Sequence, residues 1–169
     1  MTKKSFSVRI YLQDGHASGV KMISKSKWSG RGLVIPRTSL QAEMCRDELN
    51  APGVFVLIDP GKKGVQPSVC IGSADPVCDP LGECDLNTES WTEVIVFASK
   101  DNTLTRKHVQ YLEARLIECA QQAKQAILQN KNSPHLPSLS AVELVCAEAF
   151  LNHMLSLYPL LGVSAFEAI

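Results

Sequence analysis

A single carboxylate on a long amphipathic segment is the feature of this sequence that most directly suggests chemistry. Glu113 lies four residues after Val109 and three before Leu116, beside the apolar stripe of an expected helix, so its carboxylate can point toward the rest of the fold. A hard cation such as Mg²⁺ or Mn²⁺ binds carboxylate oxygen and completes its coordination with water and phosphate. The alternative is a surface glutamate paired with a nearby Lys or Arg.

His108 is the second titratable group of interest on this segment. It lies five positions before Glu113 and could act as a base or a hydrogen-bond donor beside a bound metal. A lone histidine on a helix is more often a structural residue, so both roles stay open.

The elements that must position this carboxylate are two short apolar runs and the segments that follow them. Residues 54–58 and 68–71 flank a turn rich in Gly and Pro, which predicts an antiparallel hairpin. Residues 94–98 are a third strand of the same sheet. Apolar residues then recur at helical spacing and predict the longest helix over 104–130.

The preceding part of the chain, residues 1–50, is predicted to form a small β-rich subdomain. Apolar and polar residues alternate over 6–12, which is the period of a half-buried strand, and 20–23 and 33–35 are further short strands. Residues 51–169 form the second domain, which ends in a C-terminal helix.

Two capping boxes are expected to begin helices. Thr38 with Gln41 opens a short one, and Ser140 with Glu143 opens the last one, which stops before Pro159. This last helix is expected to bury one apolar stripe, made of Val142, Val145, Ala149, Phe150, Met154 and Leu157.

The charges sum to zero but are unevenly distributed. A net charge of zero argues against a large electrostatic footprint for nucleic acid. Residues 1–37 nevertheless hold eight Lys and Arg against one Asp, which allows a basic face on a neutral protein. The alternative is that these charges only solvate the surface. The residues predicted to contact nucleic acid are Arg9, Lys25, Lys27, Arg31 and Arg37.

The six cysteines contain no Cys-x-x-Cys pair, so we expect no structural zinc. There is no signal peptide, and no apolar run reads as long enough to cross a bilayer. We therefore expect a cytoplasmic protein with reduced thiols and no membrane association.

Three segments follow one another in an order that resembles the GIY-YIG nuclease family: Gly53-Val54-Phe55, Cys70-Ile71-Gly72 and the helical residues 111–117. The resemblance covers most of the chain and is to a bacterial or phage subfamily with an N-terminal β-rich extension. It implies an α+β fold with a small antiparallel three-stranded sheet flanked by helices. In that family a helix glutamate, matched by Glu113, holds one divalent metal. A hairpin tyrosine helps to deprotonate water, and an arginine holds the scissile phosphate.

Three positions depart from the family pattern. Phe55 and Cys70 stand where the two motif tyrosines would be, and Pro80 falls on or next to the arginine position. Phe55 cannot serve as a base, and a thiol on a buried strand is expected to stay protonated. The site therefore lacks both its base and its phosphate clamp.

Three function classes follow from this pattern. The preferred one is a catalytically degenerate GIY-YIG-fold protein that keeps Glu113 and binds nucleic acid, DNA in the first place. One alternative is a weakly active Mg²⁺-dependent DNA endonuclease, whose cleavage Glu113→Ala would abolish. The other is a protein-interaction module that binds a protein partner and no nucleic acid.

Overall fold

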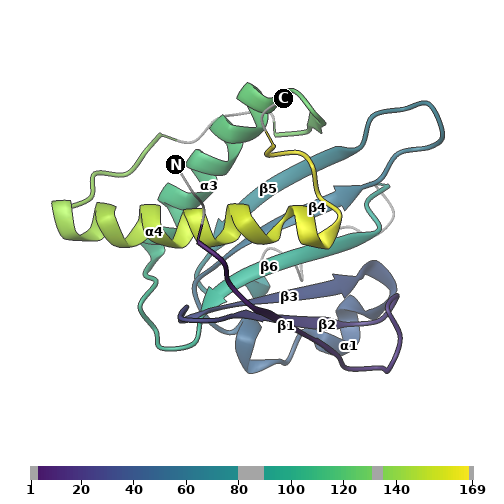
Figure 1. Cartoon of the computed structure of the whole chain (residues 1–169), viewed down its shortest axis with the longest axis horizontal. Coiled ribbons are helices and arrows are strands. Elements are labelled where there is room, and N and C mark those ends of the chain that lie inside the picture. Colours follow the sequence, from purple (N-terminus) through teal and green to yellow (C-terminus); the bar gives the residue numbers. More distant parts are fainter. Residues whose placement is uncertain (1–3, 80–89, 131–134, 168–169) are drawn as a thin grey trace.

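The computed structural model describes residues 4–79, 90–130 and 135–167, and it has a mixed α+β fold built on one seven-stranded sheet (Figure 1). The strand order is β1-β2-β3-β6-β4-β5-β7, and every neighbouring pair is antiparallel except β5 with β7. The strands are β1 (Val8–Leu12), β2 (Lys21–Lys25), β3 (Gly30–Pro36), β4 (Gly53–Asp59), β5 (Ser68–Ala74), β6 (Glu93–Ser99) and β7 (Ile127–Leu128).

Two long helices cover one face of this sheet, α3 (Arg106–Ala123) and α4 (Ala141–Leu157) (Figure 1). The short elements are α1 (Leu40–Glu43) and the 3-10 turns η1 (Arg37–Ser39), η2 (Asp47–Leu49) and η3 (Pro159–Leu161).

The predicted hairpin and third strand are confirmed as antiparallel neighbours in the order β6-β4-β5. They do not form a sheet of their own, so the predicted three-stranded sheet is too small. Strand β3 pairs with the other edge of β6, from Gly30–Ser99 to Pro36–Glu93, and brings β1 and β2 with it. The sheet therefore runs without a break across the expected boundary between 1–50 and 51–169.

Strand β6 is buried on both of its faces. Ile95 and Phe97 belong to a first cluster beneath α3 and α4, whereas Val94 and Val96 belong to a second cluster on the opposite face. A strand covered on both sides reads as a continuous apolar run instead of an alternating one. This explains the sequence Val-Ile-Val-Phe-Ala in its centre.

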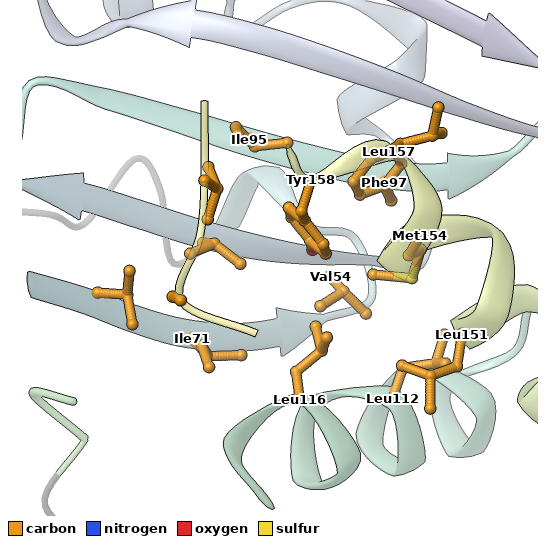
Figure 2. Packing of buried hydrophobic residues seen from close by; sticks show 14 of the residues in the cluster. Val54, Ile71, Ile95, Phe97, Leu112, Leu116, Leu151, Met154, Leu157 and Tyr158 are labelled. Carbon is orange, nitrogen blue, oxygen red and sulfur yellow. The ribbon is translucent and has the colours of Figure 1, made fainter. Parts of the chain in front are cut away.

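The first cluster forms where both long helices meet the sheet (Figure 2). Leu112 and Leu116 of α3 and Met154 of α4 point toward the strands in this view. Tyr158, directly after α4, is fully buried among them, with its ring 5.3 Å from that of Phe97 in an edge-on arrangement. The C-terminal end of α4 is therefore part of the core.

The second cluster is covered by the segment between β3 and β4. Leu40 and Leu49 pack there with Trp91 against inward residues of β3, β4 and β6. The predicted capping box at Thr38 is wrong, because α1 begins after Ser39, which makes no side-chain cap hydrogen bond.

The capping box at the start of α4 is confirmed. The Ser140 backbone amide donates to Glu143 Oε1 at 3.1 Å, and the Glu143 amide donates to Ser140 Oγ at 3.2 Å. Helix α3 ends earlier than the predicted residue 130, at Ala123, because Lys124 adopts a left-handed conformation with φ of 55°. A left-handed residue commonly ends a helix, and β7 follows it.

The predicted burial of the first turns of α4 is wrong. Val142 and Val145 are 75% and 70% exposed, and Ala149 is also exposed. These turns project beyond the sheet and α3 (Figure 1), so there is nothing beneath them to cover their apolar side chains. Phe150, Met154 and Leu157 are buried as expected, together with Ala147 and Leu151.

The segment Ala141–Leu161 also corrects the expectation that no apolar run is long enough to cross a bilayer. It has 21 residues and a mean hydropathy of 1.3, which passes the test of length and composition. About a third of its apolar window is buried, by side chains that pack in the first cluster.

The buried hydroxyl of Tyr158 makes a stability prediction. Its oxygen has no hydrogen-bond partner among the described residues, and burial raises the pKa of Tyr158. Because an unsatisfied buried hydroxyl carries a desolvation cost, Tyr158→Phe should raise the free energy of unfolding by about 1 kcal/mol in urea denaturation.

The matched control is Tyr111→Phe, which removes the hydrogen bond from the Tyr111 hydroxyl to the Glu148 carboxylate. Because this acceptor is charged, the loss should lower the free energy of unfolding by about 1.5 kcal/mol. A Tyr158→Phe protein less stable than the wild type would contradict the prediction.

Candidate functional site

Glu113 lies at the edge of the sheet, where α3 packs against β5. The hydroxyl of Ser73 donates to Glu113 Oε1 at 2.8 Å, and the carboxylate is half-buried. The predicted inward direction is therefore confirmed, and its neighbour is the C-terminal part of β5.

Side chains close the outer edge of β5 beyond the short strand β7. Strand β7 pairs only with Ser68 and Val69. At Ile71, the backbone amide donates to Asn130 Oδ1 at 2.9 Å, and Asn130 Nδ2 donates to the Ile71 carbonyl at 2.7 Å. Asn130 thus pairs with the strand through its side-chain amide. The Glu113 carboxylate likewise accepts a hydrogen bond at Ser73, two residues farther along β5.

Burial raises the pKa of Glu113 above its ordinary value, although hydrogen bonds from the Ser73 hydroxyl and backbone amide oppose this. The carboxylate opens into a cavity of about 330 Å³, which is also lined by Arg106, Gln110 and His135. Arg106 lies seven residues before Glu113, which is the spacing of one helix face, so helical periodicity could have revealed it.

These residues do not fit a resident Mg²⁺ or Mn²⁺ ion. Within residues 4–79, 90–130 and 135–167, no three His, Cys, Asp or Glu side chains are grouped to hold a metal. Among the described residues, Glu113 is the one carboxylate that lines this cavity, and Arg106 places a competing cation there.

The side chains at the two motif positions of the hairpin lie on the face of the sheet opposite α3. Phe55 belongs to the second cluster and Cys70 packs against it, whereas Glu113 approaches from α3. Phe55 is paired with Gly72, and a Cβ placed on Gly72 would come within 2.3 Å of Phe55 Cζ. The ring thus lies against the Gly72 backbone. Pro80 lies outside the described residues, as does Cys84, and no disulfide joins the described cysteines.

His108 serves as a helix cap in this structure. Its Nδ1 accepts a hydrogen bond from the Thr105 backbone amide at 3.0 Å, and its own amide donates to Thr105 Oγ1 at 3.4 Å. The ring is buried and lines a separate cavity with Trp28 and His153. The structure does not bring His108 into the cavity of Glu113.

The five predicted nucleic-acid contacts are divided among four places. Lys25 Nζ lies 4.1 Å from the Phe6 ring centroid and donates to Ser156 of α4 at 2.9 Å. Lys27 lines the cavity of His108. The Arg37 guanidinium lies 4.8 Å from the Trp91 ring centroid. The remaining two, Arg9 and Arg31, come together in another cavity.

This basic cavity lies on the sheet face opposite the long helices and has a volume of about 400 Å³. Its cations are Arg9 of β1, Arg31 of β3 and Lys100, which directly follows β6. Tyr11 and Glu48 also line it, and Tyr11 is 59% exposed. The floor consists of apolar side chains, among them Met22, Leu33, Val96 and Ala98.

Sequence reasoning missed Lys100 and Tyr11 as members of this cavity. Lys100 continues the two-residue alternation of Val96 and Ala98, and Tyr11 lies two residues after Arg9, so strand periodicity was the available signal in both cases. No pattern within a single segment of the sequence indicates that β1, β2, β3 and β6 lie side by side.

Comparison with family models, with curated proteins and with solved structures finds no significant match for the chain. The resemblance to the GIY-YIG family therefore rests on the residues quoted for it.

The raised pKa of Glu113 predicts how its charge affects stability. Because the folded state favours the protonated carboxyl, stability from this group is present below its ordinary pKa of 4.5 and is lost as pH rises through the folded-state value. Glu113→Gln keeps an acceptor for Ser73 without the charge. The variant should have a higher melting temperature than the wild type at pH 7, and this difference should disappear at pH 4.

The control is Glu118→Gln on the same helix, which removes a partly exposed carboxylate paired with Arg115 at 3.2 Å. It should change the melting temperature little at either pH, because exposed ion pairs contribute little. A Glu113→Gln protein that is less stable at pH 7 but not at pH 4 would show that the negative charge has a favourable partner.

Proposed function

We propose that this protein is a catalytically degenerate relative of the GIY-YIG nucleases that binds nucleic acid through the basic cavity. The observation that carries the proposal is the convergence of Arg9 from β1, Arg31 from β3 and Lys100 from the end of β6 onto one cavity with an exposed tyrosine. Cations neutralise phosphates and supply the sequence-independent part of nucleic-acid affinity.

Local charge supports binding even though the net charge is zero. Of the described residues that line the cavity, Glu48 is the one carboxylate, and it forms an ion pair with Arg46 at 3.0 Å. Both Arg46 and Arg31 lower the pKa of Glu48, although its burial opposes this. Since the Glu48 carboxylate is already paired with Arg46, the cavity keeps an excess of positive charge and can attract an anion.

The residues at the predicted catalytic positions support the absence of hydrolysis. Phe55 has no ionisable group, and His108 uses Nδ1 as the acceptor of its helix cap. Loss of one charge-stabilising donor commonly costs about 3 kcal/mol of transition-state stabilisation, and a base that acts on water contributes about 10²- to 10⁴-fold. The carboxylate instead stabilises the edge of β5 through Ser73.

Binding is tested with the double variant Arg9→Ala, Lys100→Ala and a labelled oligonucleotide at increasing salt, followed by fluorescence anisotropy. If each cation neutralises a single-strand phosphate, the slope of log affinity against log salt should fall in magnitude by about 1.4. The control is Lys62→Ala, Lys63→Ala, which removes the same charge from an exposed turn far from these strands in sequence. Equal losses in both double variants would contradict a role for the cavity.

Cleavage is tested with plasmid and single-stranded DNA in the presence of Mg²⁺ or Mn²⁺. The purified protein should give no product above background, because Phe55 and Cys70 stand at the positions of the motif tyrosines and Pro80 at or next to that of the motif arginine. Cleavage that disappears in Glu113→Ala would refute the degenerate assignment and favour the weakly active endonuclease. Failure to bind any oligonucleotide would favour the protein-interaction module.

A further inference from the structure

We infer that the basic cavity holds one unpaired nucleotide, with the base on a row of apolar side chains and the phosphate on a parallel row of cations. This inference rests on the proposed function and names the form of nucleic acid that the same cavity accepts. It follows from the strand register, which places the two rows side by side on one face of the sheet.

The first row runs straight across four strands. Tyr11 is paired with Met22, Met22 with Leu33, and Leu33 with Val96. Residues paired in register point to the same face, and all four side chains belong to residues that line the cavity. The row therefore forms an apolar floor with an exposed aromatic ring at its outer end.

The second row lies two residues away along each strand. Arg9 is paired with Ser24, and Arg31 is paired with Ala98. Lys100 follows two residues after Ala98, just beyond the end of β6, and so lies one further step away from the apolar row. Because a strand rises about 3.4 Å per residue, the two rows are about 7 Å apart. A nucleotide carries its base and its phosphate on different sides of one sugar ring, so it can span both rows at once.

Tyr11 can supply stacking to the base. Its ring is exposed, and every base has a π-face, so stacking on an aromatic side chain tolerates any sequence. Met22 beside it is fixed in place, because Arg46 donates to Met22 Sδ at 3.3 Å. The platform is therefore preorganised by the Arg46 ion pairs with Glu43 and Glu48.

Arg31 is the cation best placed for the phosphate. Its Nε is buried and has no hydrogen-bond partner among the described residues, and its charge lowers the pKa of the nearby Glu48. Arg9 stands exposed on β1 at the mouth of the cavity. A phosphate between them would provide the strong charge-assisted acceptor that a guanidinium prefers.

The shape of the site favours an unpaired strand over a duplex. Reading a duplex requires an element that projects into a groove, such as a helix or a β-ribbon. Here the cations surround a hollow with an apolar floor, and duplex bases are stacked inside the helix where they cannot reach that floor. An unpaired base can enter it, as single-strand binding proteins combine basic grooves with aromatic platforms.

The experiment measures affinity of the full chain for three probes by competition: oligothymidylate, the same strand in duplex with oligoadenylate, and thymidine monophosphate. Oligothymidylate should bind most tightly. Tyr11→Ala should weaken its binding about 5- to 150-fold, which is the range for loss of one stacked base. Tyr11→Phe keeps the ring and should change the affinity less than twofold, as should the control Leu12→Ala on the opposite face of β1.

Each other outcome overturns the inference. Equal affinity for the duplex would exclude an unpaired base, and equal affinity for thymidine monophosphate would make the cavity a free-nucleotide site. Affinity unchanged in Tyr11→Ala but lost in Arg9→Ala, Lys100→Ala would refute the stacking row and leave the proposed function standing. No binding of any probe would refute both. Far-ultraviolet circular dichroism of each variant checks that its fold is retained.

Discussion

The pairing of β6 along both of its edges is the interaction on which the rest of the fold depends. Strand β3 attaches the N-terminal section to one edge, and β4 attaches the hairpin to the other. Both faces of β6 are covered, by Ile95 and Phe97 under the helices and by Val94 and Val96 on the other side. Neither half of the chain can therefore be removed without exposing an apolar strand to water.

The two faces of this sheet are covered to different extents. On the helix face, the ends of α3 and α4 and the buried Tyr158 pack against the sheet to form the first cluster. The opposite face is covered over β4 and β6 by the segment between β3 and β4, and it stays open over β1 and β2. The basic residues of the N-terminal strands differ in the same way. Arg9 and Arg31 line the open cavity, whereas Lys25 lies on the helix face and donates to Ser156 of α4.

Local patterns predicted most strands and the capping box of Ser140, because both depend on neighbours in sequence. The extent of the sheet was not predictable in this way, since Gly30 and Ser99 pair across a long stretch of chain. The same reason hid the basic cavity, whose members come from separate strands. Val142 was misjudged because apolar character alone does not say whether a neighbouring element exists to cover it. For His108 a chemical and a structural role both stayed open, because the sequence does not show that its Nδ1 accepts from the Thr105 amide.

The closure of β5 by Asn130 and Glu113 has a consequence for the protein in crowded solution. An uncovered outer strand offers its amides and carbonyls to any other extended chain, and this is a common start of aggregation. Asn130 occupies both backbone groups of Ile71, and Glu113 puts a desolvated carboxylate beside Ser73. An incoming strand would have to displace an amide and then pair against a negative charge. Glu113, which resembles a metal ligand in the sequence, thus disfavours the addition of another strand at this edge.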